Sequence, residues 1–293
     1  MRALILGVTG MLGHRLWLAF QRRFETWGTL RGDYAGMTHR ELFDPARLAE
    51  RVRADEIGTV ERALLEVRPD VVINCIGALK QRASGRDPVA SISLNALFPH
   101  LLANLCQRGC IRLIHISTDC VFSGRKGMYR ETDPADAEDL YGRTKLLGEL
   151  SGPGCLTLRT SFIGRELGTA HGLLEWFLSN SGGRVPGYRR GVFSGFTTQA
   201  FAEILCEVVD RHREIAGLYH VSSEPISKFE LLHMVRRALN VDIEIEPDDS
   251  VQYDRSLDGT RFRQTVGMNL PSWSDMMADL MNEPADYYRS RQG

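Results

Sequence analysis

Residues 7–13 read GVTGMLG, so Gly7, Gly10 and Gly13 stand three residues apart, directly after the apolar run 2–6. A glycine turn between a strand and a helix is the setting in which this spacing binds the pyrophosphate of a dinucleotide. The first glycine permits the tight turn, the second lets the backbone approach the phosphates, and the third lets the helix pack on the sheet. Amide groups at the start of the helix then donate to the phosphates. The stretch predicts a dinucleotide-binding turn, although a glycine turn without a ligand has the same pattern.

Apolar runs alternate with helical patterns from this turn to about residue 160. VVINCIG (71–77) and IRLIHIST (111–118) are continuous apolar runs, as expected for parallel strands that are covered on both faces. The alternation predicts an α/β fold with a Rossmann-type, doubly wound, mainly parallel sheet. Beyond about residue 165 the alternation breaks. We therefore expect an NAD(P)-binding domain at 1–165, to which later segments return, and a smaller, mainly substrate-binding lobe at 166–293.

Composition narrows the class of protein. The 293 residues include 36 basic and 37 acidic ones, a formal net charge of -1, so no basic surface for nucleic acid or for an acidic membrane is predicted. The six cysteines form no CxxC pair and no cluster with metal spacing, which indicates reduced thiols and no metal site. No signal peptide and no apolar stretch of membrane-spanning length are apparent. We expect a cytoplasmic protein without nucleic-acid or membrane partners; whether it forms a homodimer is left open.

The end of the second predicted strand bears on the choice of cofactor. TWGTLRGD (26–33) places Arg31 nearest the strand, and Asp33 follows two residues later. An Arg at this point accommodates the 2′-phosphate of NADP, whereas an acidic residue binds the ribose hydroxyl of NAD. Arg31 therefore favours NADP(H) over NAD(H), Asp33 argues weakly for NAD(H), and a solvated loop residue is the alternative for Arg31.

YGRTK (141–145) places Tyr141 and Lys145 four residues apart, so both lie on one face of a helix. With 8 tyrosines and four lysines in the chain, chance predicts only ~0.1 such pairs. Gly148, one turn further on, permits another element to approach closely. Upstream, Thr118 stands at the predicted end of a parallel strand, where open α/β sheets bind their ligands. An ordinary helix surface is the alternative, with Lys145 paired to Glu149.

The tyrosine and lysine suit ketone reduction. A free tyrosine has a pKa near ~10, and a neighbouring ammonium together with an oxidised nicotinamide lowers that pKa. We expect Tyr141 to protonate a carbonyl oxygen as hydride reaches the carbon, while Thr118 donates a hydrogen bond to the same oxygen. Lys145 also bonds the nicotinamide ribose in this scheme. Arg is a poor substitute there, because its fork geometry differs from a point donor.

Taken in order, GVTGMLG, INCIGA, STDCVFSG, YGRTKLLGE and LRTSFIG resemble an extended short-chain dehydrogenase/reductase, and most of all the dTDP-4-dehydrorhamnose reductase family. The later DRSLDGTRFRQTVG and PSW are similar to the C-terminal region of that family. The resemblance implies NAD(P)H and reduction of the C4 ketone of a nucleotide-diphosphate-linked 4-keto-6-deoxyhexose. It also implies a place in deoxysugar biosynthesis for surface polysaccharide or a related product.

The resemblance also implies roles for particular residues. The catalytic residues of the family fall on Thr118, Tyr141 and Lys145, and its substrate-contacting aspartate falls on Asp119. Its cofactor residues correspond to Gly10, Met11, Leu12, Cys75, Ile76 and Gly77, in addition to Gly7, Gly13 and Arg31 from the reasoning above.

The chain departs from the family pattern in several places. Cys120 stands where the family commonly has Tyr, and Phe162 takes the place of a sugar-contacting Trp. Arg165 is a candidate phosphate contact, with a salt-bridged surface residue as the alternative. In the unusual segment 77–88, Lys80 and Arg82 could approach a diphosphate or be solvated. These departures leave the reaction type as expected and the sugar open, including one with an N-acetyl group.

Two other functions are compatible with the fold. An epimerase or dehydratase would need further acid and base residues, and a dehydratase typically has Asp-Glu after the threonine, where this chain has Asp119 and Cys120. A non-catalytic nucleotide-binding scaffold subunit has no need of an intact Thr118, Tyr141 and Lys145 set.

Overall fold

The computed structural model describes residues 1–79 and 83–282. Its centre is a seven-stranded sheet in which all neighbours are parallel. The strands are β1 (Arg2–Leu6), β2 (Glu25–Thr29), β3 (Leu48–Ala49), β4 (Val71–Asn74), β5 (Arg112–Thr118), β6 (Cys155–Thr160) and β10 (Gly217–His220). Their order, β10-β6-β5-β4-β1-β2-β3, means that the chain starts in the middle and reverses direction between β1 and β4. This is the predicted Rossmann-type, doubly wound sheet.

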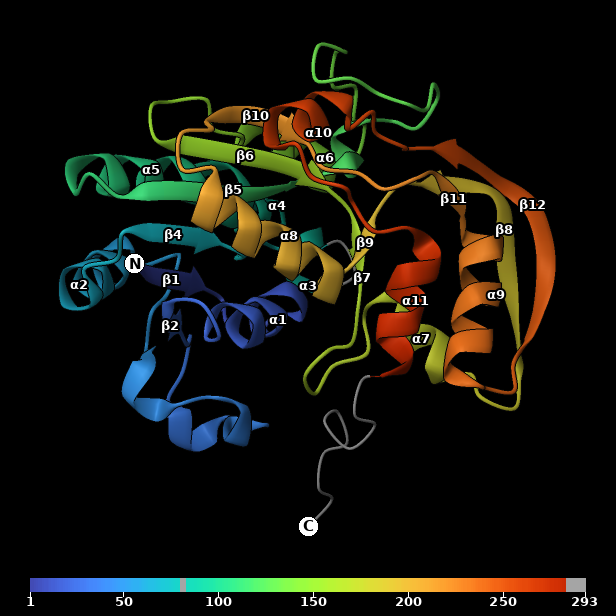
Figure 1. Cartoon of the computed structure of the whole chain (residues 1–293), viewed down its shortest axis with the longest axis horizontal. Helices are drawn as coiled ribbons and strands as arrows, with labels where there is room; N and C mark the ends of the chain where they lie inside the picture. Colours follow the sequence, from blue (N-terminus) through green and yellow to red (C-terminus); the bar gives the residue numbers. More distant parts are fainter. Residues whose placement is uncertain (80–82, 283–293) are drawn as a thin grey trace.

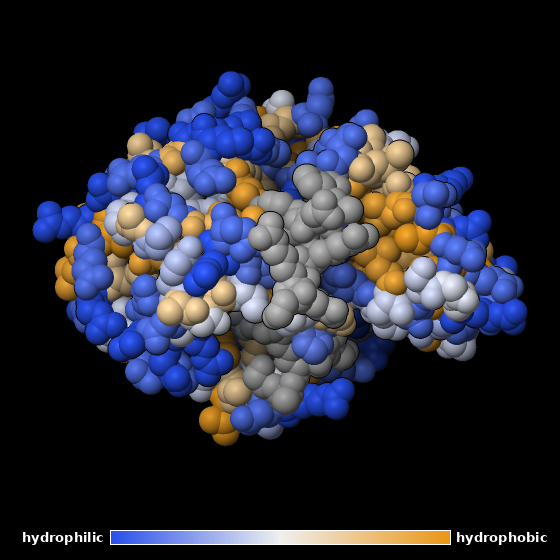
Figure 2. All heavy atoms as spheres, turned by 90° about the horizontal axis from the view of Figure 1, so that it is seen from below, coloured by the Kyte–Doolittle hydropathy of each residue, from blue (hydrophilic) through white to orange (hydrophobic). Residues whose placement is uncertain are grey.

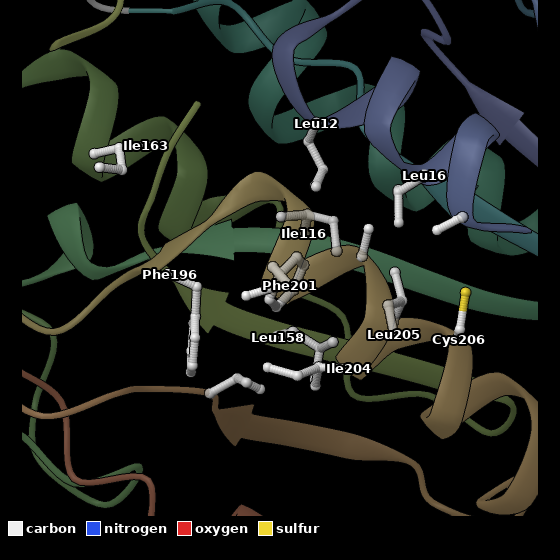
Figure 3. Close-up of a cluster of buried hydrophobic side chains, with 14 of the residues drawn as sticks. Leu12, Leu16, Ile116, Leu158, Ile163, Phe196, Phe201, Ile204, Leu205 and Cys206 are labelled. Carbon is white, nitrogen blue, oxygen red and sulfur yellow. The ribbon is translucent and has the colours of Figure 1, made fainter. Parts of the chain in front are cut away.

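Helices cover both faces of this sheet (Figure 1). Helices α1 (Met11–Phe20) and α8 (Thr198–Arg211) lie together on one face, and α2 (Ile57–Val67), α5 (Phe98–Arg108) and α6 (Leu140–Leu147) lie on the other. Successive residues of a strand point to opposite faces, so Leu113 joins the core under α2 and α5, while Ile114 and Ile116 join the core under α8. Figure 3 shows this second core, where Phe201 and Leu205 of α8 approach the sheet.

The segment before β5 is one long interrupted helix. It comprises α4 (Pro88–Ser91), a π-helix labelled η4 (Ile92–Leu97) and α5, which ends with Gly109 as its C-cap. By length and composition, Pro88–Arg108 could cross a membrane, so the expectation that no stretch of this kind exists was wrong. In the fold, its residues Phe98 and Leu102 are buried in the core between this helix and the sheet.

A second, smaller sheet of order β11-β8-β12 lies beside the carboxyl ends of the central strands (Figure 1). It contains β8 (Arg184–Phe193), β11 (Ile226–Ser227) and β12 (Glu244–Asp254), and α9 (Lys228–Leu239) packs on it. Ser227 caps α9 with a reciprocal bond to Glu230, which fixes where the helix begins. The short pair β7 (Phe162–Ile163) and β9 (Phe196–Thr197) joins the two parts. The remaining helices are α3 (Ala83–Arg86), α7 (Leu173–Leu178), α10 (Thr260–Val266) and α11 (Trp273–Met281).

The surface seen from below is mixed in character. Hydrophilic residues cover most of this face, and the most visible group of hydrophobic residues lies on the right, on the side of the second sheet (Figure 2).

Short 3₁₀ segments complete the fold: η1 (Tyr34–Gly36), η2 (Arg40–Leu42), η3 (Pro45–Arg47) and η5 (Asp119–Val121). The last of these directly follows β5 and begins the candidate site.

Candidate active site

The glycine turn links β1 to α1 as the sequence predicted. Gly7 has φ +79°, a left-handed conformation that glycine adopts without strain. A Cβ on Gly13 would stand 2.1 Å from the carbonyl oxygen of Gly7, so only glycine lets the helix pack this closely on the turn. Gly10 is the N-cap of α1 and offers no capping side chain. The first amides of α1 are therefore left for an external acceptor, which fits a cofactor phosphate.

The segment after β4 lies beside this turn. Cys75 donates its backbone amide to Leu6 (N···O 3.2 Å), and a Cβ on Gly7 would stand 3.1 Å from Ile76. The strand order reverses between β1 and β4, which is the point where doubly wound sheets bind their ligands. The predicted cofactor residues after β1 and β4 thus meet at one place. The side chain of Leu12 is buried in the core (Figure 3), so only its backbone is available to a ligand.

The end of β2 is tied to the same turn, because Thr29 accepts a hydrogen bond from the Gly7 amide (3.1 Å). Arg31 follows and is exposed. Asp33 pairs with Arg51 (2.5 Å), and this pair holds the pKa of Asp33 below its usual value. The acidic residue that argued for NAD(H) is therefore already paired within the protein.

Thr118, at the end of β5, and Tyr141, on α6, come together. Thr118 Oγ1 donates to Asp119 (3.1 Å), accepts from the Cys120 amide (3.1 Å), and lies within hydrogen-bonding reach of the Tyr141 phenol. Gly142 makes this approach possible, since a Cβ there would stand 2.2 Å from the carbonyl oxygen of Cys120. Asp139 starts the helix by accepting the Gly142 amide (2.8 Å).

Lys145 is buried one turn beyond Tyr141. Its ammonium donates to the carbonyl oxygen of Ile116 on β5 (2.7 Å). Burial lowers its pKa to about 8, against the charge of Glu149, which acts in the opposite direction. The pKa of Tyr141, by contrast, is raised above its usual value by burial, against the hydrogen bond with Thr118, which lowers it. The phenol is therefore protonated at neutral pH, as a proton donor must be. The lowering that we expect depends on an oxidised nicotinamide beside the phenol and stays a prediction.

Asn95 connects this helix with the cofactor segment. It lies in the π-helix, accepts the Ala78 amide (2.8 Å), and donates to the carbonyl of Ala78 (3.1 Å) and the hydroxyl of Thr144 (3.2 Å). A Cβ on Gly148 would stand 1.8 Å from the carbonyl oxygen of Asn95. The predicted close approach at Gly148 is thus confirmed, and the approaching element is the π-helix.

A buried ion pair fixes the far end of α6. Arg159 on β6 forms two hydrogen bonds to Glu149 (2.8 and 2.7 Å), and Ser117 donates to the same carboxylate (2.6 Å). Arg159 also contacts His220 (3.2 Å), whose other ring nitrogen lies 2.9 Å from the carbonyl of Tyr129. The alternative pairing of Lys145 with Glu149 is therefore not found among the ion pairs of the described residues, because Arg159 occupies that carboxylate.

Two predicted substrate residues lie further along the chain. Phe162 is half-buried, with its ring centroid 6.1 Å from that of Phe201. Arg165 is half-buried and pairs with Glu175 on α7 (2.6 Å). Their contact with a substrate stays a prediction. Lys80 and Arg82 lie outside the described residues.

Sequence reasoning missed three residues of the second lobe. Lys228, at the start of α9, and Arg255, after β12, both influence Asp119, lowering its pKa against the effect of burial. Tyr253 lies beside Arg255, with 5.1 Å between the guanidinium and the ring centroid. The sequence contains only four lysines, and this scarcity, which singles out Lys145, could equally have singled out Lys228.

The chain is similar to known proteins over most of its length. The family model described as "RmlD substrate binding domain" matches residues 1–285. A probable low-salt glycan biosynthesis reductase, Agl14, from Haloferax volcanii is 32% identical over 176 residues, which are 56% of this chain and 58% of the relative. Methionine adenosyltransferase 2 subunit beta from Danio rerio is 26% identical over 254 residues, 82% and 74% of the two chains. The chain spans about half the length of the first curated relatives it matches.

Solved structures share the whole fold. A hypothetical dTDP-4-dehydrorhamnose reductase from Sulfolobus tokodaii has a TM-score of 0.78 at 26% identity and covers 94% of this chain and 99% of its own. The dTDP-4-dehydrorhamnose reductase from Bacillus anthracis, solved in complex with NADP, has a TM-score of 0.78 at 19% identity. The match covers 95% of this chain and 97% of that structure. Other neighbours of this fold were solved with NAD.

Proposed function

Since this chain belongs to the RmlD substrate-binding-domain family, we propose that it is an NAD(P)H-dependent ketoreductase that acts at C4 of a nucleotide-linked 4-keto-6-deoxyhexose. The observation that carries the proposal is the meeting of Thr118 and Tyr141 beside the buried Lys145, at the same edge of the sheet as the glycine turn. The product would serve deoxysugar biosynthesis, for a surface polysaccharide or a related glycan.

When bound, the nicotinamide cofactor would supply the hydride for reduction of the substrate ketone. Tyr141 donates its phenolic proton to the ketone oxygen, and its raised pKa keeps that proton available at neutral pH. Thr118 turns its hydroxyl from Asp119 to the same oxygen as negative charge develops there. Once Thr118 no longer donates to it, the Asp119 carboxylate accepts hydrogen bonds from hydroxyl groups of the sugar.

Lys145 and Asn95 position these groups. Lys145, which donates to the Ile116 carbonyl, would donate a further hydrogen bond to the nicotinamide ribose, and its positive charge would favour the phenolate that remains after proton transfer. Asn95 holds the segment after β4 against α6, so cofactor and proton donor keep a fixed separation.

NADPH is the proposed cofactor. Arg31 stands exposed at the end of β2 beside the glycine turn, and Asp33 is paired with Arg51. An exposed guanidinium at this position suits the 2′-phosphate of NADPH better than the 2′-hydroxyl of NADH.

The test is an absorbance assay of reduced-nicotinamide oxidation with a panel of nucleotide-linked 4-keto-6-deoxysugars, each with NADPH and with NADH. We expect oxidation that depends on at least one sugar and is faster with NADPH. No oxidation with any member of the panel would exclude the reductase.

A second candidate is a non-catalytic nucleotide-binding scaffold subunit. One observation bears on a subunit role: the likeness to a protein named as the beta subunit of a methionine adenosyltransferase extends over 82% of this chain. The same assay separates the two functions, because a scaffold subunit binds NADPH without oxidising it in the presence of any sugar of the panel.

A further inference from the structure

Charged side chains from distant parts of the chain converge beside the end of β5. Lys228 is the first residue of α9 and Arg255 follows β12, both in the second lobe, whereas Asp119 and Cys120 lie in η5. Figure 1 shows the carboxyl ends of the central strands directed toward the second sheet, which explains how these segments meet. Burial lowers the pKa of Lys228 and raises that of Asp119, and the opposite charges of the two groups, with that of Arg255, act against burial in each case.

Lys228 makes no ion pair with a carboxylate in residues 1–79 and 83–282. Its ammonium stands over the ring of Phe193, 3.5 Å from the centroid. The register of the second sheet holds it there, because Ile226 pairs with Phe193 and Ser227 with Val192 immediately before the lysine. The half-buried ammonium is therefore held on an aromatic face without a full counter-charge.

Arg255 strengthens the positive charge at this place. Its Nε donates to the carbonyl of Phe122 (3.0 Å), and its backbone amide donates to Val192 (3.0 Å). Its guanidinium also lies 3.9 Å from the sulfur of Cys120. Two cations thus face one carboxylate, that of Asp119, and the excess positive charge suits an anionic ligand.

We propose that Lys228, with Arg255 beside it, binds the diphosphate of the nucleotide-sugar substrate. The inference rests on the proposed substrate class, in which the diphosphate is the anionic part of an otherwise uncharged sugar nucleotide. Asp119 would then contact the sugar between the diphosphate and the ketone, whose oxygen lies at Thr118 and Tyr141. The substrate would extend from the end of β5 toward the start of α9.

The experiment measures ligand binding by calorimetry and needs no turnover. The ligands are dTDP and UDP, compared with thymidine and uridine, which lack phosphate. We expect Lys228→Met to weaken binding of the preferred diphosphate by about 10- to 100-fold, as for a lost hydrogen bond to a charged group, and to leave NADPH binding unchanged. The matched control is Lys126→Met, because Lys126 is an exposed lysine paired with Asp133, and it should bind like the wild type.

A pH series gives a second, independent readout. Burial lowers the pKa of Lys228 to about 8, and the groups facing it are Asp119, Arg255 and Cys120, whose thiol pKa is raised to about 12. Above pH 7 the diphosphate is fully ionised. As pH rises from 7 to 9, Lys228 loses its proton, so the affinity of the wild type should fall about tenfold. Lys228→Arg should keep the affinity and remove this dependence, because Arg stays charged.

The outcomes are distinct. If the wild type binds dTDP or UDP and Lys228→Met binds it equally well, the inference is wrong while the proposed function stands. If the wild type binds neither diphosphate more tightly than the nucleosides, a thymidine or uridine diphosphate sugar is excluded as the substrate, and the inference about Lys228 is overturned with it. An unchanged pH dependence in Lys228→Arg would also overturn the role of Lys228.

Discussion

The cofactor side of the candidate site consists mainly of backbone groups, whereas the substrate side consists mainly of charged side chains. After β1 and β4, the site consists of backbone amides and glycines, packed so closely that a Cβ on Gly13 would meet the Gly7 carbonyl at 2.1 Å. Beside η5, it consists of long charged side chains from α9 and the end of β12. In the proposed function, a dinucleotide pyrophosphate would be bound by a backbone geometry that tolerates no added atom, whereas the substrate would be recognised by side chains that can be exchanged without altering the backbone. The first side should therefore respond to the smallest change in volume, and the second to changes in charge.

The largest expected effect lies where the two sides meet. Tyr141→Phe removes the proposed proton donor and keeps its volume, so kcat should fall about 10³-fold with NADPH binding intact. Steady-state kinetics and a cofactor titration check this. Tyr34→Phe is the control, because the Tyr34 hydroxyl donates to the Arg40 carbonyl in an exposed region, and the variant should keep full activity. A Tyr141→Phe variant with most of the wild-type activity would show that the proton comes from another group.

The cofactor side is tested by Gly13→Ala. The added methyl group must push α1 away from the turn, so we expect the free energy of unfolding to fall by about 2–3 kcal/mol and NADPH affinity to fall at least about tenfold. Denaturant titration and cofactor titration measure the two effects. Gly58→Ala in α2 is the matched control: its Cβ meets nothing within 4 Å, and the substitution should be neutral or stabilising. Equal behaviour of the two variants would contradict a tightly packed turn.

The comparison also explains what could be read from the sequence. Gly7, Gly10 and Gly13 are contiguous with the strand and helix they join, and Tyr141 and Lys145 share one helix, so local spacing was sufficient for both. Gly148 predicted a close neighbour, but only the fold identifies that neighbour as Asn95 in the π-helix. Lys228 and Arg255 reach η5 from elements more than a hundred residues away in the chain, through the register of a sheet that no local pattern encodes.

Buried histidines give a third prediction, which concerns how the free energy of unfolding changes with pH. Burial lowers the pKa of His14 and His220 to about 4, and that of His115 well below its usual value of 6.5. Between pH 6.5 and 4 the unfolded chain therefore binds more protons than the folded one, so stability falls as pH falls. At pH 5.5 each histidine should cost about 1.4 kcal/mol relative to pH 7.5.

The variant His220→Gln isolates the contribution of one histidine to this pH dependence. The loss of unfolding free energy between pH 7.5 and pH 5.5 should be smaller than in the wild type by about 1.4 kcal/mol, whatever the variant costs at neutral pH. Denaturant titrations at the two pH values give the difference. An unchanged difference would mean that His220 already carries its proton beside Arg159, contrary to the geometry of that contact.

The smallest expected effect concerns Arg31, the charged side chain proposed for the 2′-phosphate of the cofactor. Arg31 is exposed, so its contact with the 2′-phosphate of NADPH is screened by water, and Arg31→Ser should raise the KM for NADPH only about fivefold, or about 1 kcal/mol. The KM for NADH should not change, because NADH lacks that phosphate. The control is Arg22→Ser, an arginine just beyond the end of α1 that pairs with Glu203 away from the glycine turn. Equal changes for both cofactors would assign Arg31 to folding, and a wild type that prefers NADH would show that Asp33 decides the cofactor despite its pairing with Arg51.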